Sequence, residues 1–255
     1  AQAGLMAPSE LWSCLPCGLT QLLGAARGSQ PKMKDTGAAL IFLHGSGDSG
    51  EGIRNWLEQE SNGTFVSSLR SAQIMTIFPD APAMPYSLIG GLPQTVWFDR
   101  TAMAYEAPED VPGIKRSVEQ VDQEIEKLVQ SGIPLSKIGV AGFSMGACLA
   151  LHVGYGIGRY AGQLGLVASM STFVAEGSCL DELARTRQGP PLFMAHGRDD
   201  RMIRLPWAEA THKRLVDAGL PVPKELLTFP ELGHELCGQE VKLLLDFILP
   251  HLASQ

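Results

Sequence analysis

The sequence lacks an excess of positive charge, a long apolar run and an even set of cysteines. Its 255 residues carry a formal net charge of −7, which gives no electrostatic reason to expect a nucleic acid or an anionic membrane as a partner. No run of about eighteen uncharged apolar residues occurs, so a membrane-spanning helix is not expected. The cysteines number five, and this odd count favours reduced thiols and a cytoplasmic location over a disulfide framework.

The first 36 residues differ in composition from the rest of the chain. The segment begins apolar and then becomes rich in Gly, Ser and Pro, and we expect a poorly ordered or loosely packed extension. Glu10 and Pro16 interrupt the apolar part and no basic stretch precedes it, which disfavours a secretory signal. Cys14 and Cys17 have the C-x-x-C spacing, but no preceding strand or second cysteine pair completes a redox or zinc site. Acylation of Cys14 or Cys17 is the alternative role for this segment.

From residue 37 to residue 255, short apolar runs alternate with helical patterns. We predict buried strands over Ala38–Leu43, Gln73–Phe78, Ile138–Ala141, Leu164–Ala168, Leu192–Ala195 and Glu225–Phe229. Helices are predicted over Gly50–Glu60, Ile114–Gln130, Met145–Tyr155, Leu180–Thr186, Pro206–Ala218 and Gln239–Leu249. This alternation predicts one α/β domain with a mostly parallel central sheet and helices on both faces. Sites in such sheets lie at the carboxyl ends of the strands.

One long stretch, Pro79–Arg100, shows no helical pattern. Its four prolines up to Pro93 and the pair Gly90-Gly91 predict a loop without regular structure. Long loops of this kind are commonly lids or binding loops. Apolar residues give it a surface that could accept an acyl group, or that could simply pack on the core: Leu88, Ile89, Leu92, Val96, Trp97 and Phe98.

A serine stands between two glycines directly after a predicted strand. Gly142–Gly146 (GFSMG) fits the G-x-S-x-G elbow, in which a sharp strand-to-helix turn exposes the serine hydroxyl at the end of a sheet. A serine hydroxyl is a weak nucleophile and needs a base to take its proton. In proteins with this elbow the serine is followed along the chain by an acidic residue and then by a histidine. Ser144 is therefore the candidate nucleophile.

The candidate base is His234, which lies in a loop after the last predicted strand and follows Gly233. The other histidines fit the role less well. His152 and His212 fall within predicted helices, and His251 lies beyond the last one. His44 and His196 each follow a strand and precede a glycine, so we expect them to be turn residues near the site.

The residues alone leave the acid open between Asp199 and Asp200, because both closely follow the strand Leu192–Ala195. An oxyanion hole needs two backbone N–H groups aimed at the developing negative charge. Met145, directly after the serine, supplies one, and the glycine-rich loop His44–Gly47 supplies the other. Phosphate binding by that loop is disfavoured because the lysine of a P-loop is missing.

Six motifs together resemble the acyl-protein thioesterase and lysophospholipase family of the α/β-hydrolases: IFLHGSGDSG, FPDAP, VWFD, GFSMGACLAL, HGRDD and GHE. The resemblance runs from about Ala38 to Leu252. With serine at position 46, the sequence resembles the lysophospholipase-like branch of this family, since the thioesterases proper usually carry leucine at this position.

The resemblance implies Asp200 as the triad acid, with Ser144 as nucleophile and His234 as base. It also implies an oxyanion hole formed by the N–H groups of Ser46 and Met145. Trp97 would line the acyl pocket, and Leu88, Ile89 and Leu92 are further candidates for substrate binding. Members hydrolyse thioesters of S-acylated proteins, or oxygen esters of lysophospholipids and small acyl substrates, without a metal or cofactor.

The expected function is that of a serine hydrolase, an acyl-protein thioesterase that removes palmitate from proteins. The alternatives are a carboxylesterase or lysophospholipase of short acyl esters and, more remotely, a non-catalytic acyl-binding protein. Arg198 and Arg201 depart from the family pattern beside the acid, where they could pair with Asp199 or favour an anionic substrate. We expect transient association with a membrane surface, and a monomer or weak dimer.

Overall fold

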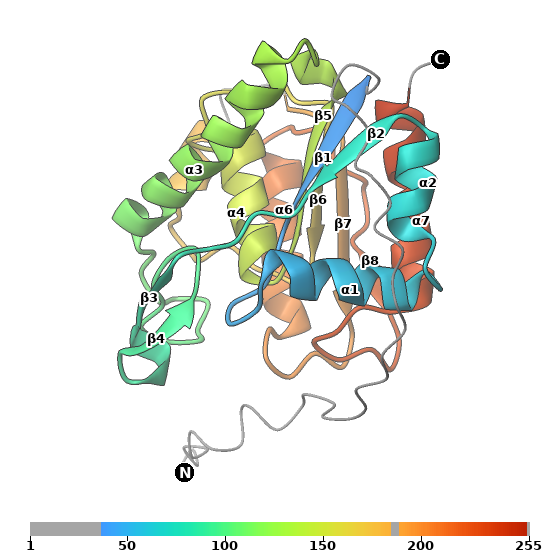
Figure 1. Ribbon diagram of the computed structural model, residues 1–255. Coiled ribbons are helices and arrows are strands. Elements are labelled where there is room, and N and C mark those ends of the chain that lie inside the picture. Colours follow the sequence, from blue (N-terminus) through green and yellow to red (C-terminus); the bar gives the residue numbers. More distant parts are fainter. Residues whose placement is uncertain (1–36, 185–188, 254–255) are drawn as a thin grey trace, which may run out of the picture. The chain divides into compact units, whose positions relative to one another are not determined.

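Six parallel strands form the central sheet of the computed structural model, which describes residues 37–184 and 189–253 (Figure 1). The strands lie side by side in the order β2 (Ile74–Ile77), β1 (Ala38–Leu43), β5 (Ile138–Phe143), β6 (Leu166–Met170), β7 (Leu192–Gly197) and β8 (Leu227–Phe229). After β1 the chain adds β2 on one side of it, and β5 to β8 follow on the other side. The strand order therefore switches between β1 and β5, and ligands bind outside the carboxyl ends of strands at such a switch point.

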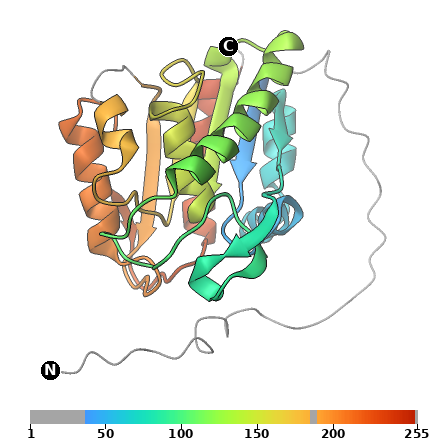
Figure 2. The ribbon, with the colours of Figure 1, turned by 90° about the vertical axis from the view of Figure 1, so that its left-hand side faces the viewer.

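Helices cover both faces of the sheet. Figure 2 looks onto the face covered by α3 (Val111–Gln130), α4 (Met145–Tyr155), α5 (Cys179–Ala184) and α6 (Leu205–Asp217). The other face is covered by α1 (Gly50–Glu60), α2 (Phe65–Ser71) and α7 (Gly238–Leu252). Successive residues of a strand point to opposite faces, so Ile41 joins the first core and Phe42 the second. Burial on both faces explains why the strands are apolar throughout.

The predicted parallel sheet with helices on both faces is confirmed, and the predicted strands and helices recur with ends shifted by a few residues. The longest helix, α3, begins at Val111, before its predicted start, because the Asp110 side chain accepts a hydrogen bond from the Gly113 N–H and caps it. The predicted extension over residues 1–36, with Cys14 and Cys17, lies outside the described residues. Across the described ranges, no helix has both the length and the apolar character that a membrane span requires.

The prediction of an irregular loop over Pro79–Arg100 is wrong in part. Two short antiparallel strands, β3 (Ala83–Tyr86) and β4 (Leu92–Thr95), form a hairpin there, joined through the 3₁₀-helix η3 (Ser87–Ile89). Pro85 and Pro93 stand opposite each other in the hairpin. A two-stranded ribbon consists of edges alone, and edges tolerate proline because no further strand needs its missing N–H. The backbone N–H of Gly47 donates to the Thr95 carbonyl, which ties the hairpin to the loop after β1.

Glu240, in the first turn of α7, is a fully buried acid whose two carboxylate oxygens have no hydrogen-bond partner in the part of the chain that is described. Burial raises the pKa of this carboxyl to about 8, although the nearby backbone N–H of Cys237 acts in the opposite direction. The unfolded carboxyl titrates near pH ~4.3. Between these values the folded protein holds one proton more than the unfolded chain.

The free energy of unfolding should therefore fall as the pH rises from about 5 to 8, since a raised carboxyl pKa favours the folded state only while the group is protonated. The largest slope is about 1.4 kcal/mol per pH unit. We expect Glu240→Gln to gain up to about 4 kcal/mol relative to the wild type across this interval. Urea unfolding at pH 5, 6.5 and 8 measures the gain, with the exposed Glu225→Gln as control. Equal pH dependence in the wild type and Glu240→Gln would contradict the assignment.

Candidate active site

Ser144 occupies a strained turn between β5 and α4. Its backbone has φ 54° and ψ −119°, a left-handed conformation that non-glycine residues adopt at a cost of about 1–3 kcal/mol. A Cβ on Gly142 would lie 2.4 Å from the Gly146 carbonyl carbon, and a Cβ on Gly146 would lie 2.3 Å from the Leu43 carbonyl oxygen. Both glycines are therefore required by close approach of the backbone. The predicted strand-to-helix elbow is confirmed.

The side chains of Ser144, His234 and Asp200 form a continuous hydrogen-bonded chain. His234 Nε2 lies 3.0 Å from Ser144 Oγ, and His234 Nδ1 lies 2.7 Å from Asp200 Oδ2. The Asp200 side chain is fully buried, and its Oδ1 accepts hydrogen bonds from the N–H groups of Met202 and Ile203. Because a carboxylate only accepts, Nδ1 carries the proton and Nε2 is free to accept the serine proton. The arrangement resembles the Ser-His-Asp triad of serine hydrolases.

The structure shows which of the two candidate acids contacts the histidine. Asp200 contacts His234, whereas Asp199 is exposed and its backbone N–H donates to the Leu232 carbonyl. A Cβ on Gly197 would lie 2.3 Å from that carbonyl oxygen, so the glycine lets the loop that carries His234 approach β7.

Arg198 and Arg201 are both exposed. Arg198 Nε donates to Thr228 Oγ1 at 3.0 Å. Within the described ranges no ion pair joins either arginine to an acid, so the pairing considered with Asp199 does not form.

Two further histidines, His44 and His196, support the site from buried positions. His44 Nε2 accepts from the Ala81 N–H at 2.9 Å, and Nδ1 lies 2.7 Å from the Gly45 carbonyl. Burial lowers the pKa of His44, against the raising effect of the hydrogen bond to Gly45. Burial likewise lowers the pKa of His196, whose Nε2 lies 2.8 Å from the Ile203 carbonyl oxygen. Both are held as neutral rings that brace the turns after β1 and β7.

The loop after β1 passes directly beside the serine, because a Cβ on Gly45 would lie 3.3 Å from Ser144 Cβ. The predicted oxyanion donors are the N–H groups of Ser46 in this loop and of Met145 at the start of α4. Within residues 37–184 and 189–253, neither N–H is used in a hydrogen bond outside regular helix and strand pairing. Both donors are therefore free for a ligand, and their role stays a prediction.

The residues predicted to bind the acyl group occupy three different environments. Trp97 is fully buried, and its Nε1–H donates to the His44 carbonyl at 2.8 Å. The Trp97 indole is thereby packed against the loop that follows β1. Leu88 and Ile89 are half-buried against the core, while 63% of Leu92 is exposed on the hairpin. Their contact with a substrate remains a prediction.

Phe143 is a residue of the site that the sequence did not indicate. Its ring lies 5.0 Å from the His234 ring and 5.1 Å from the Trp56 ring, measured between centroids. The Phe143 ring, tilted against the imidazole and edge-on to Trp56, limits where the imidazole can turn. Phe143 fills an unspecified position of the elbow motif, so no pattern in the sequence marks it.

Comparison with known proteins places this geometry in a family. Residues 29–252 match the family described as Phospholipase/Carboxylesterase. The chain belongs to the phospholipase/carboxylesterase family. This family member is therefore a serine esterase of the α/β-hydrolase fold, with Ser144, His234 and Asp200 in a triad-like arrangement.

Curated relatives carry two kinds of name. The chain is 34% identical over 220 residues to lysophospholipase-like protein 1 of Mus musculus, covering 86% of this chain and 88% of the relative. It is 31% identical over 215 residues to acyl-protein thioesterase 1 homolog 2 of Dictyostelium discoideum, covering 84% and 93%. Among solved structures, acyl-protein thioesterase 2 of Zea mays is similar, with a TM-score of 0.70, 25% identity and coverage of 86% and 95%.

Proposed function

We propose that this serine esterase is an acyl-protein thioesterase, which removes acyl chains such as palmitate from S-acylated proteins. The observation that carries the proposal is the buried Asp200–His234–Ser144 chain of hydrogen bonds, set beside a glycine loop with a free N–H group. Similarity to proteins named acyl-protein thioesterase supports the choice of substrate.

In the proposed reaction, Ser144 Oγ attacks the carbonyl carbon of the thioester while His234 Nε2 takes the serine proton. Asp200 keeps the imidazole in the reactive tautomer and stabilises the imidazolium. The Ser46 and Met145 N–H groups donate to the oxyanion of the tetrahedral intermediate. His234 then protonates the leaving cysteine thiol. Water, activated by His234, attacks the acyl-enzyme and releases the fatty acid and the free serine.

The second candidate is a carboxylesterase or lysophospholipase that acts on short acyl esters. The buried position of Trp97 and the packing of Leu88 and Ile89 on the core favour it, because these side chains then do not offer a deep apolar channel. Similarity to a protein named lysophospholipase-like supports it as well. For either substrate we propose a cytoplasmic enzyme, monomeric or weakly dimeric, that meets membrane surfaces transiently. The free thiols of Cys148, Cys179 and Cys237 are consistent with a reducing compartment.

Turnover as a function of acyl chain length separates the two candidates. Each methylene that becomes buried contributes about 0.8 kcal/mol, or up to about fourfold in kcat/KM. For the thioesterase we expect kcat/KM to rise from acetyl to palmitoyl in a series of p-nitrophenyl esters, and a palmitoyl-cysteine peptide to be cleaved. A fall of about tenfold or more beyond butyryl, with no peptide cleavage, would instead establish the short-chain esterase.

A further inference from the structure

Three potential metal ligands that the hydrolytic site does not use meet on the face of the sheet covered by α4. Glu109 lies just before α3, and Cys148 and His152 are four residues apart on α4, which places them on the same side of that helix. One ligand atom from each of the three side chains lies within 4.8 Å of the other two. The three residues come from separate segments that only the fold brings together.

The polar atoms of this cluster lack hydrogen-bond partners. His152 is fully buried and the Glu109 side chain is 8% exposed. Within the described residues, neither Glu109 carboxylate oxygen nor His152 Nε2 meets the geometry of a hydrogen bond, although Nε2 and Oε1 lie 3.4 Å apart and the Ser178 side chain and the Cys179 backbone also lie near the carboxylate. Buried polar atoms are nearly always satisfied by a partner. The unsatisfied Nε2 and Oε1 atoms, 3.4 Å apart, indicate a ligand that both contact.

The spacing between two of the three ligand atoms equals that of two ligands of a tetrahedral metal ion. Two ligands that each lie about 2.0–2.1 Å from a zinc ion are about 3.4 Å apart at the tetrahedral angle, and the separation of His152 Nε2 from Glu109 Oε1 equals this. The other ring nitrogen, Nδ1, lies 4.0 Å from the Cys179 sulfur. A metal-bound histidine commonly donates its second N–H to a neighbouring group, which fixes the ring. Cys179 thus orients His152 from the side away from the metal.

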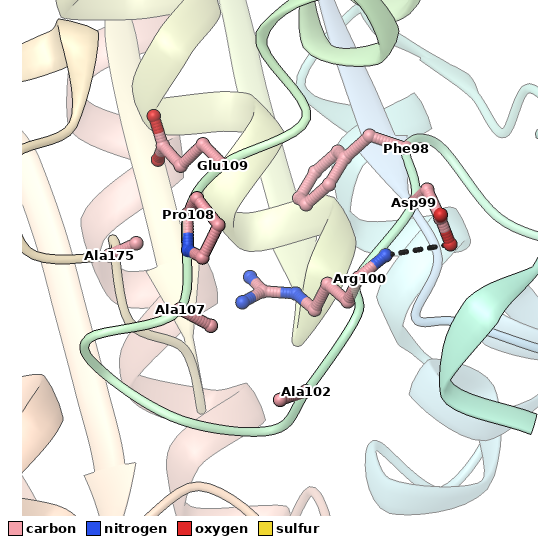
Figure 3. Close-up of a pocket in the computed structure, with 8 residues that line it drawn as sticks. All are labelled: Phe98, Asp99, Arg100, Ala102, Ala107, Pro108, Glu109 and Ala175. Carbon is pink, nitrogen blue, oxygen red and sulfur yellow. Dashed lines mark hydrogen bonds between the residues drawn. The ribbon is translucent and has the colours of Figure 1, made fainter.

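We propose that Glu109, Cys148 and His152 Nε2 bind one zinc-class divalent cation, with water as the fourth ligand. A mixed set of oxygen, sulfur and nitrogen donors suits zinc or cobalt, whereas calcium and magnesium prefer oxygen alone. Binding deprotonates the Cys148 thiol, and the proton goes to solvent. Figure 3 shows Glu109 at the edge of a surface pocket, with its carboxylate turned away from Arg100.

The cation has a structural role. It joins the segment before α3 to α4, the helix that starts next to Ser144. The proposed hydrolytic reaction has no step that involves Glu109, Cys148 or His152. The proposal therefore stands or fails independently of the substrate.

Cobalt replaces zinc as a visible probe in the test. The full chain carries Cys14→Ser and Cys17→Ser throughout, because that C-x-x-C pair could bind cobalt by itself. Titration of the reduced protein should give one cobalt per chain, with a near-ultraviolet sulfur-to-cobalt band and four-coordinate visible bands that zinc removes. Cys148→Ala should abolish the sulfur band, and the control Cys237→Ala, which replaces a free cysteine on the opposite face, should keep it.

Two more variants keep the proposal testable if Cys148→Ala does not fold. Glu109→Gln should weaken cobalt binding at least tenfold while the sulfur band remains. Cys179→Ala, which removes the acceptor, should keep the band and weaken binding by about 10–100-fold, as expected for an orienting group. Zinc should also raise Tm in the background protein and leave Tm of Cys148→Ala unchanged.

Absence of the sulfur band, or a band undiminished in Cys148→Ala, would overturn the proposal and leave Glu109 and His152 as a metal-free ion pair. Loss of the band in Cys179→Ala would overturn the ligand set by making Cys179 a ligand.

Discussion

Replacement of Ser144 by alanine is expected to lower kcat for an acyl ester by about a millionfold and to abolish labelling by a fluorophosphonate probe. The hydroxyl is the group that His234 Nε2 contacts at 3.0 Å, and alanine leaves the base with nothing to deprotonate. Removal of the nucleophile of such a unit costs about as much as removal of the whole unit. Active-site labelling followed by gel fluorescence, together with kcat on a p-nitrophenyl ester, measures both effects.

Ser169→Ala is the matched control. Ser169 is also a fully buried serine near the carboxyl end of a strand, and its partner across the β5–β6 pairing is Gly142 of the elbow. We expect this variant to be labelled like the wild type and to keep its kcat within a few-fold. Labelling of Ser144→Ala at the wild-type level would place the nucleophile elsewhere and remove the basis of the proposed reaction.

The sequence predicts the elements that repeat a clear pattern. Helices α1 and α4 lie within their predicted bounds, and the parallel strands are recognisable because burial on both faces makes them apolar throughout. Helix α2 was missed because Phe65–Ser71 is only seven residues long and its cap, Thr64, makes no side-chain cap bond. Such a helix depends on the burial of Phe65, Val66 and Leu69 against the rest of the fold, which no local pattern reports.

Parts of the site depend on tertiary contacts in the same way. Asp199 and Asp200 are adjacent, and what separates them is that Asp200 is buried against His234 and accepts two backbone hydrogen bonds. The direction of the Trp97 indole depends on its hydrogen bond to the carbonyl of His44, far away along the chain. The contact of Glu109 with His152 likewise arises only when α3 and α4 lie together. Sequence motifs identify the chemistry of a residue, and the fold decides which way its side chain turns.

Replacement of Asp200 by asparagine tests most directly whether the contact made by the fold, rather than the residue type alone, defines the acid. We expect kcat to fall by about ten-thousandfold, because an amide that donates to Nδ1 favours the tautomer with the proton on Nε2, which cannot accept the serine proton. Stability should change little, since the asparagine oxygen can still accept from the Met202 and Ile203 N–H groups. Kinetics at pH 7–8 and a thermal melt of the same preparation distinguish loss of chemistry from loss of folding.

The control is Asp199→Asn, the same chemical change one residue earlier. Asp199 is exposed, so its substitution should alter kcat less than about twofold and leave Tm unchanged. If Asp199→Asn lost as much activity as Asp200→Asn, the loop after β7 would act through its net charge, and the hydrogen bond to His234 would not be the decisive contact. The expected asymmetry follows from one geometric fact: of two neighbouring carboxylates, only that of Asp200 lies 2.7 Å from the imidazole.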